Sequence, residues 1–148
     1  MTTTEPEILQ TPEPPPQYKI SFERLAQLNR SPVTLVADRR PASCPSLQKP
    51  DRELTDVTKL ISEIARFSKG EENFIRTEMP IQEIVFRILL TRRNVPTLLS
   101  DLHYELTEKW ATPVRPITLS EETLGKILDA DTYYGFARLV TEAAKARV

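Results

Sequence analysis

The sequence predicts a mainly α-helical fold, a small helical bundle preceded by an extended, proline-rich N-terminal arm. From residue 51 onward, apolar residues recur every three or four positions, which is the period of amphipathic helices. Nine of the thirteen prolines lie within residues 1–50, where they disfavour helices because proline fixes φ and lacks a backbone N–H. These observations divide the chain into an arm over residues 1–50 and a helical domain over residues 51–148.

The first fifty residues combine a proline-rich stretch with two short apolar segments. The run TPEPPPQ favours polyproline II, which is typical of a flexible tail or of a peptide ligand for a partner groove. The segment YKISFERLAQL could form a short helix. In SPVTLVADRR, the β-prone Val33, Leu35 and Val36 predict a short strand. Both pieces could dock on the domain, and RRPASCPSLQKP then follows as a linker.

Two amphipathic segments open the predicted domain. One face of DRELTDVTKLISEIARFSKG carries apolar residues at helical spacing, namely Leu54, Val57, Ile61 and Ile64. Gly70 is a natural end for this helix. The second segment, MPIQEIVFRILLTRR, is apolar on nearly every side and predicts the central helix. Pro80 suits its first turn, and Arg92 and Arg93 complement the negative C-terminal end of its dipole.

Proline also separates the helices that follow. Pro96 breaks the central helix, and Thr97 can cap the next one. The apolar stripe of this next helix consists of Leu99, Leu102, Leu106 and Trp110. Pro113 and Pro116 forbid a helix in ATPVRPITL and predict an extended connection. Ser120 can then cap a further helix over SEETLGKIL.

The last segment, DTYYGFARLV, is compatible with two structures. A helix that begins at Asp129 or Asp131 would place four apolar residues on one face, namely Phe136, Leu139, Val140 and Ala143. An extended structure is equally acceptable, because tyrosine, phenylalanine and valine favour strands and Gly135 permits a turn. The sequence leaves both structures open.

The composition argues against several kinds of chemistry. The three glycines lie far apart in the sequence, whereas a phosphate-binding loop needs clustered glycines. One cysteine, Cys44, and one histidine, His103, cannot supply the four ligands of a structural zinc site. We therefore expect no metal and no cofactor. His103 fits a boundary histidine that makes a hydrogen bond, and the neighbouring pairs of glutamates do not share a helix face. We predict a protein without catalytic residues.

Charge and hydropathy predict in which cellular compartment the protein is found. The net charge of −1 gives no overall attraction to nucleic acid or to an anionic membrane. No run reaches the roughly 18 to 20 apolar residues that a membrane-spanning helix requires. The start, MTTTEPEIL, lacks the basic region and the apolar core of a secretory signal. With a single cysteine as well, a soluble cytoplasmic protein is expected.

The run from Pro80 to Leu139 resembles a winged helix-turn-helix domain. IQEIVFRILLTRR would be its first helix, TLLSDLHYELTEKW its second and SEETLGKIL its third, with DTYYGFARLV as a hairpin or an added helix. In that superfamily the third helix often lies in the DNA major groove. The resemblance therefore implies a possible DNA-binding protein, a transcriptional regulator or a replication accessory. The candidate nucleic-acid contacts are Arg87, Arg92, Arg93, Arg115 and Lys126.

The charge of the predicted third helix favours a different function. With the residues that follow it, in SEETLGKILDAD, this helix carries one cation, Lys126, against four carboxylates, namely Glu121, Glu122, Asp129 and Asp131. Phosphates would repel these carboxylates, since DNA-reading helices usually present cationic or neutral polar side chains. We therefore predict a non-catalytic subunit that docks in a larger protein assembly through its helical domain and its N-terminal arm. The candidate partner contacts are Tyr133, Tyr134 and Phe136.

Overall fold

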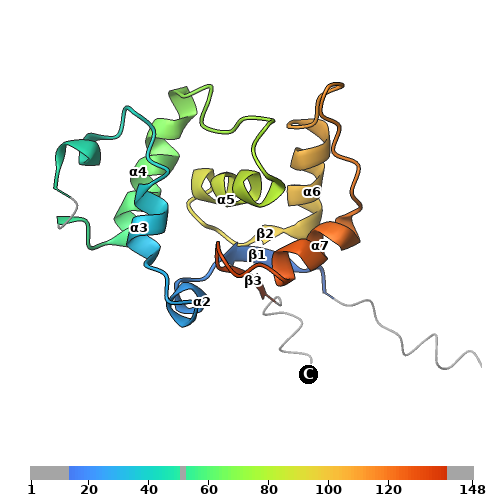
Figure 1. The fold of residues 1–148 in the computed structure, drawn as a ribbon, viewed down its shortest axis with the longest axis horizontal. Coiled ribbons are helices and arrows are strands. Elements are labelled where there is room, and N and C mark those ends of the chain that lie inside the picture. The colour runs from blue at the N-terminus through green and yellow to red at the C-terminus, as the bar shows by residue number, and fades with distance from the viewer. Residues whose placement is uncertain (1–13, 51–52, 140–148) are drawn as a thin grey trace, which may run out of the picture.

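The computed structural model describes residues 14–50 and 53–139 (Figure 1). Within them the chain forms six α-helices and one three-stranded antiparallel sheet. The elements in chain order are β1 (Gln17–Ile20), α2 (Phe22–Gln27), α3 (Pro32–Ala37), the 3₁₀ turn η1 (Pro45–Gln48), α4 (Val57–Phe67), the 3₁₀ turn η3 (Ser68–Gly70), α5 (Ile81–Thr91), β2 (Thr97–Leu98), α6 (Leu99–Glu108), α7 (Glu121–Asp129) and β3 (Phe136–Leu139). No helix in this part of the chain is long and apolar enough to span a bilayer.

The four helices predicted after residue 51 are confirmed as α4, α5, α6 and α7. The carboxylate of Asp56 caps α4, and the hydroxyl of Ser120 caps α7, as its position predicts. The prediction for Thr97 is wrong: this residue lies in β2, and its hydroxyl donates to the carbonyl of Val95 at 2.9 Å. The N-cap of α6 is Leu98, which has no capping side chain.

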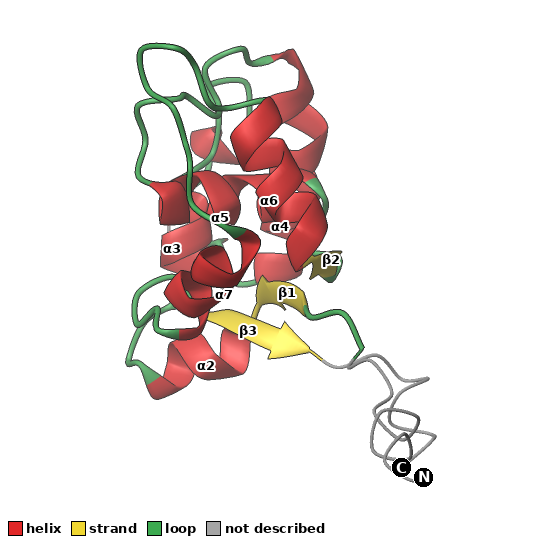
Figure 2. Cartoon of the chain, turned by 90° about the vertical axis from the view of Figure 1, so that its right-hand side faces the viewer, coloured by secondary structure: helices red, strands yellow, loops and turns green. Residues whose placement is uncertain are grey.

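Helix α5 lies at the centre of the molecule, between α4 and α6 (Figure 1). Six of its apolar side chains have no exposed surface or almost none, namely Ile84, Val85, Phe86, Ile88, Leu89 and Leu90. Figure 2 shows α4, α5 and α6 on the same side of the small sheet. The prediction of a central helix is thus confirmed.

Residues 14–50 belong to the core, so the prediction of a separate arm is wrong for them. β1 is the middle strand of the sheet, and Gln17 pairs with Leu98 of β2 on one side and with Leu139 of β3 on the other. Tyr18 and Ile20 are fully buried. Because β2 and β3 each pair with β1 alone, the sheet depends on the N-terminal strand. Residues 1–13 lie outside the described residues.

The segment SPVTLVADRR forms the helix α3, which corrects the predicted strand. The hydroxyl of Ser31 accepts a hydrogen bond from the backbone N–H of Thr34, and Pro32 occupies the first helical turn. Both features are helix-start signals. They outweigh the β propensity of the valines, because Leu35 and Val36 are buried just as well from one face of a short helix.

The last described segment is extended, so the helix alternative is wrong for residues 136–139. β3 pairs with β1 in antiparallel register, with Phe136 opposite Ile20. The preceding turn is held by the carboxylate of Asp131, which accepts hydrogen bonds from the backbone N–H groups of Tyr134 and Gly135 at 2.8 and 2.9 Å. Val140 and Ala143 lie outside the described residues. The partner of β3 is therefore a strand more than one hundred residues away in sequence.

Asn94 joins the end of α5 to the end of β1. It lies in the left-handed region with φ of 59°. Its side-chain Oδ1 accepts a hydrogen bond from the N–H of Ile20 at 2.7 Å, and its Nδ2 donates to the carbonyl of Ile20 at 2.9 Å. The amide thus satisfies both backbone groups of Ile20, as a neighbouring strand would.

We expect Asn94→Ala to lower the free energy of unfolding by about 2 kcal/mol, because two backbone groups lose their partner and alanine tolerates positive φ poorly. Urea denaturation measures this loss. The matched control is Asn29→Ala, at an exposed residue with φ of 60° and no side-chain hydrogen bond to the described residues. The control should lose at most about 1 kcal/mol. Equal losses in the two variants would contradict the role of the Asn94 amide.

Candidate functional site

Helix α7, the predicted DNA-reading helix, exposes mainly acidic side chains. Glu121, Glu122 and Asp129 are exposed, and Lys126 is the exposed cation of this helix. Asp129 accepts a hydrogen bond from the Tyr18 hydroxyl at 2.7 Å and forms an ion pair with Arg138 at 3.0 Å. The solvent-facing surface of α7 therefore has the same sign of charge as a phosphate backbone.

Two of the five predicted nucleic-acid contacts point into the protein. Arg87 donates from Nε to the carboxylate of Glu83 at 2.7 Å and from Nη1 to the carbonyl of Phe74 at 2.8 Å. Arg115 donates to the carbonyls of Thr77 and Met79, and so ties the α6–α7 connection to the loop before α5. Both guanidinium groups are half-buried and are engaged by groups of the protein itself.

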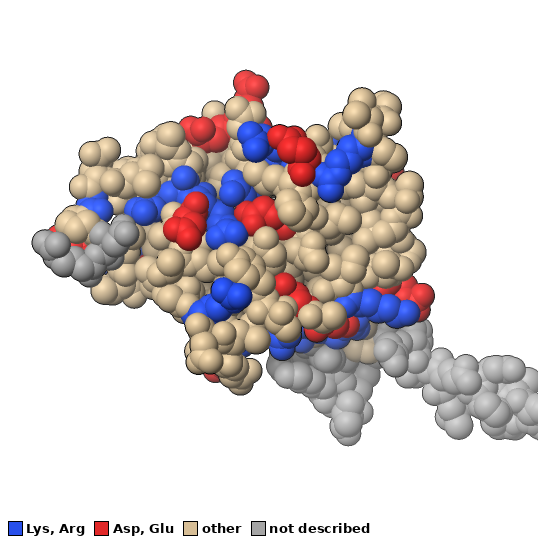
Figure 3. All heavy atoms as spheres, in the orientation of Figure 1, with Lys and Arg blue, Asp and Glu red and all other residues tan. Residues whose placement is uncertain are grey.

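The other three predicted cations are exposed but lie on different elements. Arg92 forms an ion pair with Glu105 of α6 at 2.8 Å. Arg93 follows the end of α5, and Lys126 lies on α7. Figure 3 shows acidic and basic side chains interspersed on the face that it draws. The structure therefore does not bring the five predicted residues together.

Of the three aromatic candidates for partner contact, Tyr133 is the exposed one. Tyr133 is 39% exposed, and the guanidinium of Arg30 lies 4.1 Å from the centroid of the Tyr133 ring. Phe136 is 2% exposed. Tyr134 packs against Phe86 and Phe136, with centroid distances of 5.2 and 5.6 Å. Phe136 is a core residue, which corrects its assignment as a partner contact, whereas Tyr134 is half-buried against the core.

A buried ionic network surrounds Glu83 of α5, which is 9% exposed. Arg39 donates to both carboxylate oxygens at 3.0 and 2.8 Å, and Tyr134 donates its hydroxyl at 2.7 Å. Burial alone would raise the pKa of Glu83, but hydrogen bonds from Arg39, Arg87 and Tyr134 lower it to about 2. Arg39, Arg87 and Tyr134 thus engage both oxygens of the Glu83 carboxylate and link α5 to the segment after α3 and to the turn before β3.

The sequence has one histidine and one cysteine, and both lie against other parts of the fold. His103 lies with Nε2 2.8 Å from the carbonyl oxygen of Leu119, which confirms the predicted boundary histidine. Burial raises the pKa of the Cys44 thiol to about 12, with a further contribution from the charge of Glu63. A thiolate therefore scarcely forms at neutral pH. In residues 14–50 and 53–139, no three histidine, cysteine or acidic residues are grouped to hold a metal ion.

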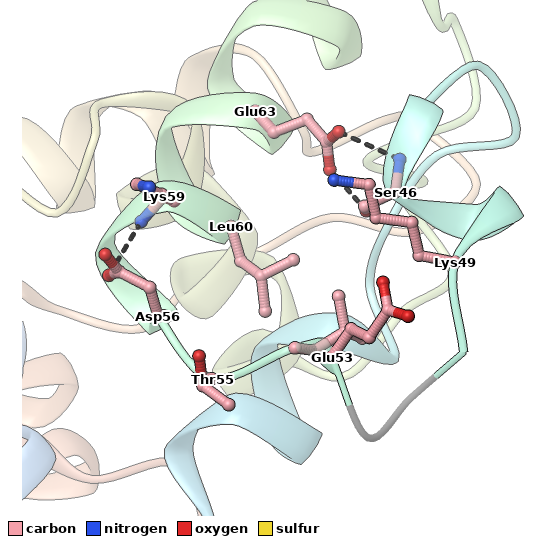
Figure 4. Close-up of a pocket in the computed structure, with 9 residues that line it drawn as sticks. Ser46, Lys49, Glu53, Thr55, Asp56, Lys59, Leu60 and Glu63 are labelled. Atoms are coloured by element: carbon pink, nitrogen blue, oxygen red, sulfur yellow. Dashed lines mark hydrogen bonds between the residues drawn. The ribbon is translucent and has the colours of Figure 1, made fainter.

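A hollow of about 330 Å³ lies between η1 and the first half of α4 (Figure 4). Leu60 points into the hollow, and Lys59 and Glu63 lie on its rim. Glu63 accepts hydrogen bonds from the N–H and the hydroxyl of Ser46 at 3.0 and 2.5 Å. Asp56 accepts from the first N–H groups of α4. Both carboxylates are therefore bound to the N-terminal ends of local helices.

A second hollow, of about 450 Å³, continues along the other half of α4. It shares Glu63 with the first and is lined by Arg66 and Phe67 of α4 and by Arg93 at the end of α5. We call the two hollows together the η1–α4 groove. Within the described part of the chain, Lys59, Arg66 and Arg93 form no ion pair. The groove therefore combines apolar surface with side chains of both charges, namely the cations Lys49, Lys59, Arg66 and Arg93 and the carboxylates Glu53, Asp56 and Glu63.

The sequence predictions identified one residue of this groove, Arg93. Lys59 and Arg66 lie seven positions apart on the polar side of the α4 segment, and this spacing places both on one helix face. That signal was present in the sequence, but η1 packs against α4 only in the folded chain. No known protein family matches the chain, and no curated protein or solved structure shows significant similarity to it.

Proposed function

We propose that the chain is a non-catalytic protein-interaction module in which α5, α6 and α7 form a winged-helix-like unit. The order α5, β2, α6, α7, β3 supports this assignment, and β1 supplies the middle strand of the sheet. The observation that carries the proposed function is the charge of α7. Its exposed side bears Glu121 and Glu122 where a DNA-binding helix would present cations.

The positions of the arginines support the same function. Affinity for DNA depends on lysine and arginine side chains that neutralise phosphates. Arg87 and Arg115 are bound to a carboxylate and to backbone carbonyls, and would leave those groups unsatisfied if they turned outward. Binding to a protein does not require free lysine and arginine side chains in this way, because protein interfaces rely on shape, apolar contact and a few matched charges.

We expect the full chain to show no saturable binding to a short labelled DNA duplex at about 50 mM salt, measured by fluorescence anisotropy. Replacing Arg92 and Arg93 by alanine should leave this result unchanged. Duplex binding that falls by about a thousandfold between about 50 and 200 mM salt, and that is lost in this double variant, would favour a DNA-binding regulator instead.

Two further experiments test the proposed function, one with a charge-reversal variant and one by isolating a complex. If the acidic surface of α7 repels DNA, Glu121→Lys with Glu122→Lys should increase duplex binding at low salt. The unmodified chain should also form a stoichiometric complex with a defined protein, one that survives gel filtration and nuclease treatment. A complex that nuclease dissolves would contradict the proposed function.

A further inference from the structure

We propose that the outward face of α6 docks a basic, arginine-containing segment of a partner protein. We call this surface the α6 face and define it by Asp101, Tyr104 and Glu108, with Glu121 of α7 at its border. This inference rests on the proposed function and deepens it, because it names the docking surface and the chemistry of the partner.

Tyr104 is the aromatic side chain at the centre of the α6 face. It is 69% exposed, whereas the leucines of α6 turn the opposite side of the helix into the core. Within the described residues, its hydroxyl makes no hydrogen bond and no cation lies over its ring. Tyr133 shows what such a ring can bind, since the guanidinium of Arg30 lies 4.1 Å from its centroid. The ring of Tyr104 is thus left for an arginine from outside.

The charged side chains of the α6 face all have the same sign. Asp101 precedes Tyr104 by three residues and Glu108 follows it by four, so both carboxylates lie on the same side of the helix as the ring. Both residues are exposed, and within the described chain neither side chain forms an ion pair. The third carboxylate of α6, Glu105, lies about 100° round the helix and pairs with Arg92. Helix α6 itself contains no lysine or arginine.

The start of α7 adds another carboxylate at the border of this face. Nε2 of His103 lies 2.8 Å from the carbonyl oxygen of Leu119, which places the start of α7 beside the middle of α6 (Figure 2). A Cβ atom added at Gly125 would lie 3.1 Å from the side chain of Leu99, so this side of α7 faces α6. Glu121 lies one turn before Gly125 on the same side, and it is exposed.

The two lysines nearest in sequence lie on other sides of these helices. Lys109 follows Tyr104 by five residues, about 140° round the helix, and its ammonium lies 5.3 Å from the centroid of the Trp110 ring. Lys126 likewise follows Glu121 by five residues and so lies about 140° away around α7. The carboxylates of the α6 face therefore have no cation among them within the described chain. Their charge is complementary to a basic ligand and repels phosphates.

The spacing of the carboxylates favours a segment that carries several cations. Asp101 and Glu108 are seven residues apart, which corresponds to about 10 Å along the helix axis. One cation cannot contact both carboxylates, but an extended peptide advances about 3.3 Å per residue, so arginines a few residues apart can. Arginine suits the whole face, because a planar guanidinium stacks on an aromatic ring and donates to carboxylates from its edge.

Anisotropy titration of the full chain with labelled peptides tests the α6 face. The first probe alternates arginine with alanine over about nine residues, a length of about 30 Å. The second probe has citrulline, a neutral analogue, in place of every arginine. The arginine probe should bind at least about fivefold more tightly. Asp101→Asn, Glu108→Gln and Glu121→Gln should each weaken its binding about two- to fivefold, and the triple variant more than about tenfold.

Three further variants separate stacking on the ring from general surface charge. Tyr104→Phe keeps the ring and should leave binding within about twofold, whereas Tyr104→Ala should weaken it about threefold. Glu23→Gln removes an exposed carboxylate from α2 and should leave binding unchanged. All the substituted residues are exposed, so each variant should stay folded, which circular dichroism checks alongside.

The remaining outcomes overturn the inference in distinguishable ways. If neither the arginine probe nor duplex DNA binds, the α6 face is not the docking surface and the proposed function stands. If the triple variant binds the probe as tightly as the parent chain, the probe follows overall charge. If duplex DNA binds and displaces the probe, both the inference and the proposed function fail. Tighter probe binding after Lys145→Gln with Arg147→Gln would identify the chain's own C-terminal segment as the occupant. A dimer that Tyr104→Ala dissociates would identify a second copy.

Discussion

Gly135→Ala is expected to lower the free energy of unfolding by about 3 kcal/mol. Gly135 has φ of +80°, a region in which a Cβ atom costs roughly 1–2 kcal/mol. A Cβ atom added there would also lie 2.6 Å from Cγ of Leu25, which is fully buried and cannot move aside freely. Overpacking of this kind adds roughly 1–3 kcal/mol. Urea denaturation monitored by circular dichroism gives the difference directly.

The chain contains a matched control for this substitution. No atom lies within 4 Å of the Cβ position at Gly70, and its φ is not positive. Gly70→Ala should therefore change the free energy of unfolding by no more than about 0.5 kcal/mol. A loss at Gly135 as small as that at Gly70 would mean that the turn before β3 tolerates a side chain.

Local signals explain which elements the sequence predicts well. Helices α4 to α7 each bury a stripe of apolar residues at helical spacing, and Asp56 and Ser120 sit where a capping side chain belongs. These signals act within one or two turns of helix. Their effect is therefore nearly the same in the sequence and in the folded chain.

Long-range pairing explains what the sequence does not reveal. The strand QYKI has four residues, follows three prolines, and pairs with residues 97–98 and 136–139. No local pattern distinguishes it from an extended arm, because its partners lie about 80 and 120 residues further along the chain. The same limit applies to β3, whose helix alternative was eliminated only by its pairing with β1.

The candidate site residues show the same difference between local sequence signals and long-range contacts. Arg87 and Arg93 look alike in the sequence, since both are arginines in or beside a strongly apolar helix. Arg87 is enclosed because Glu83, one turn earlier on α5, is brought together with Arg39 of a distant segment. Arg93 follows the end of α5 and remains exposed. The presence of a basic residue is visible in the sequence, but its availability depends on tertiary contacts.

Glu83→Gln is expected to lower the free energy of unfolding by about 3 kcal/mol near neutral pH. The substitution keeps the size of the side chain but leaves Arg39 and Arg87 without their common counter-charge in a nearly buried position. Removing one partner of a buried ion pair typically costs about 3–5 kcal/mol, and the remaining hydrogen bonds of glutamine place this case at the lower end. An exposed pair provides the control: Glu78→Gln, which breaks the ion pair with Arg76, should cost less than about 0.5 kcal/mol.

The pH dependence of stability tests the same network independently. The pKa of Glu83 is about 2 in the folded chain and has an ordinary value of 4.5. Because the folded pKa is the lower one, the carboxylate stabilises the fold above pH 4.5, and this contribution is lost as the pH falls from 4.5 towards 2. The loss amounts to roughly 3 kcal/mol. The free energy of unfolding of the Glu83→Gln variant should therefore fall less steeply over this pH range. In acid, the variant and the parent chain should then have nearly the same free energy of unfolding. Parallel curves for the two chains would show that the Glu83 carboxylate is not held in its charged form by Arg39 and Arg87.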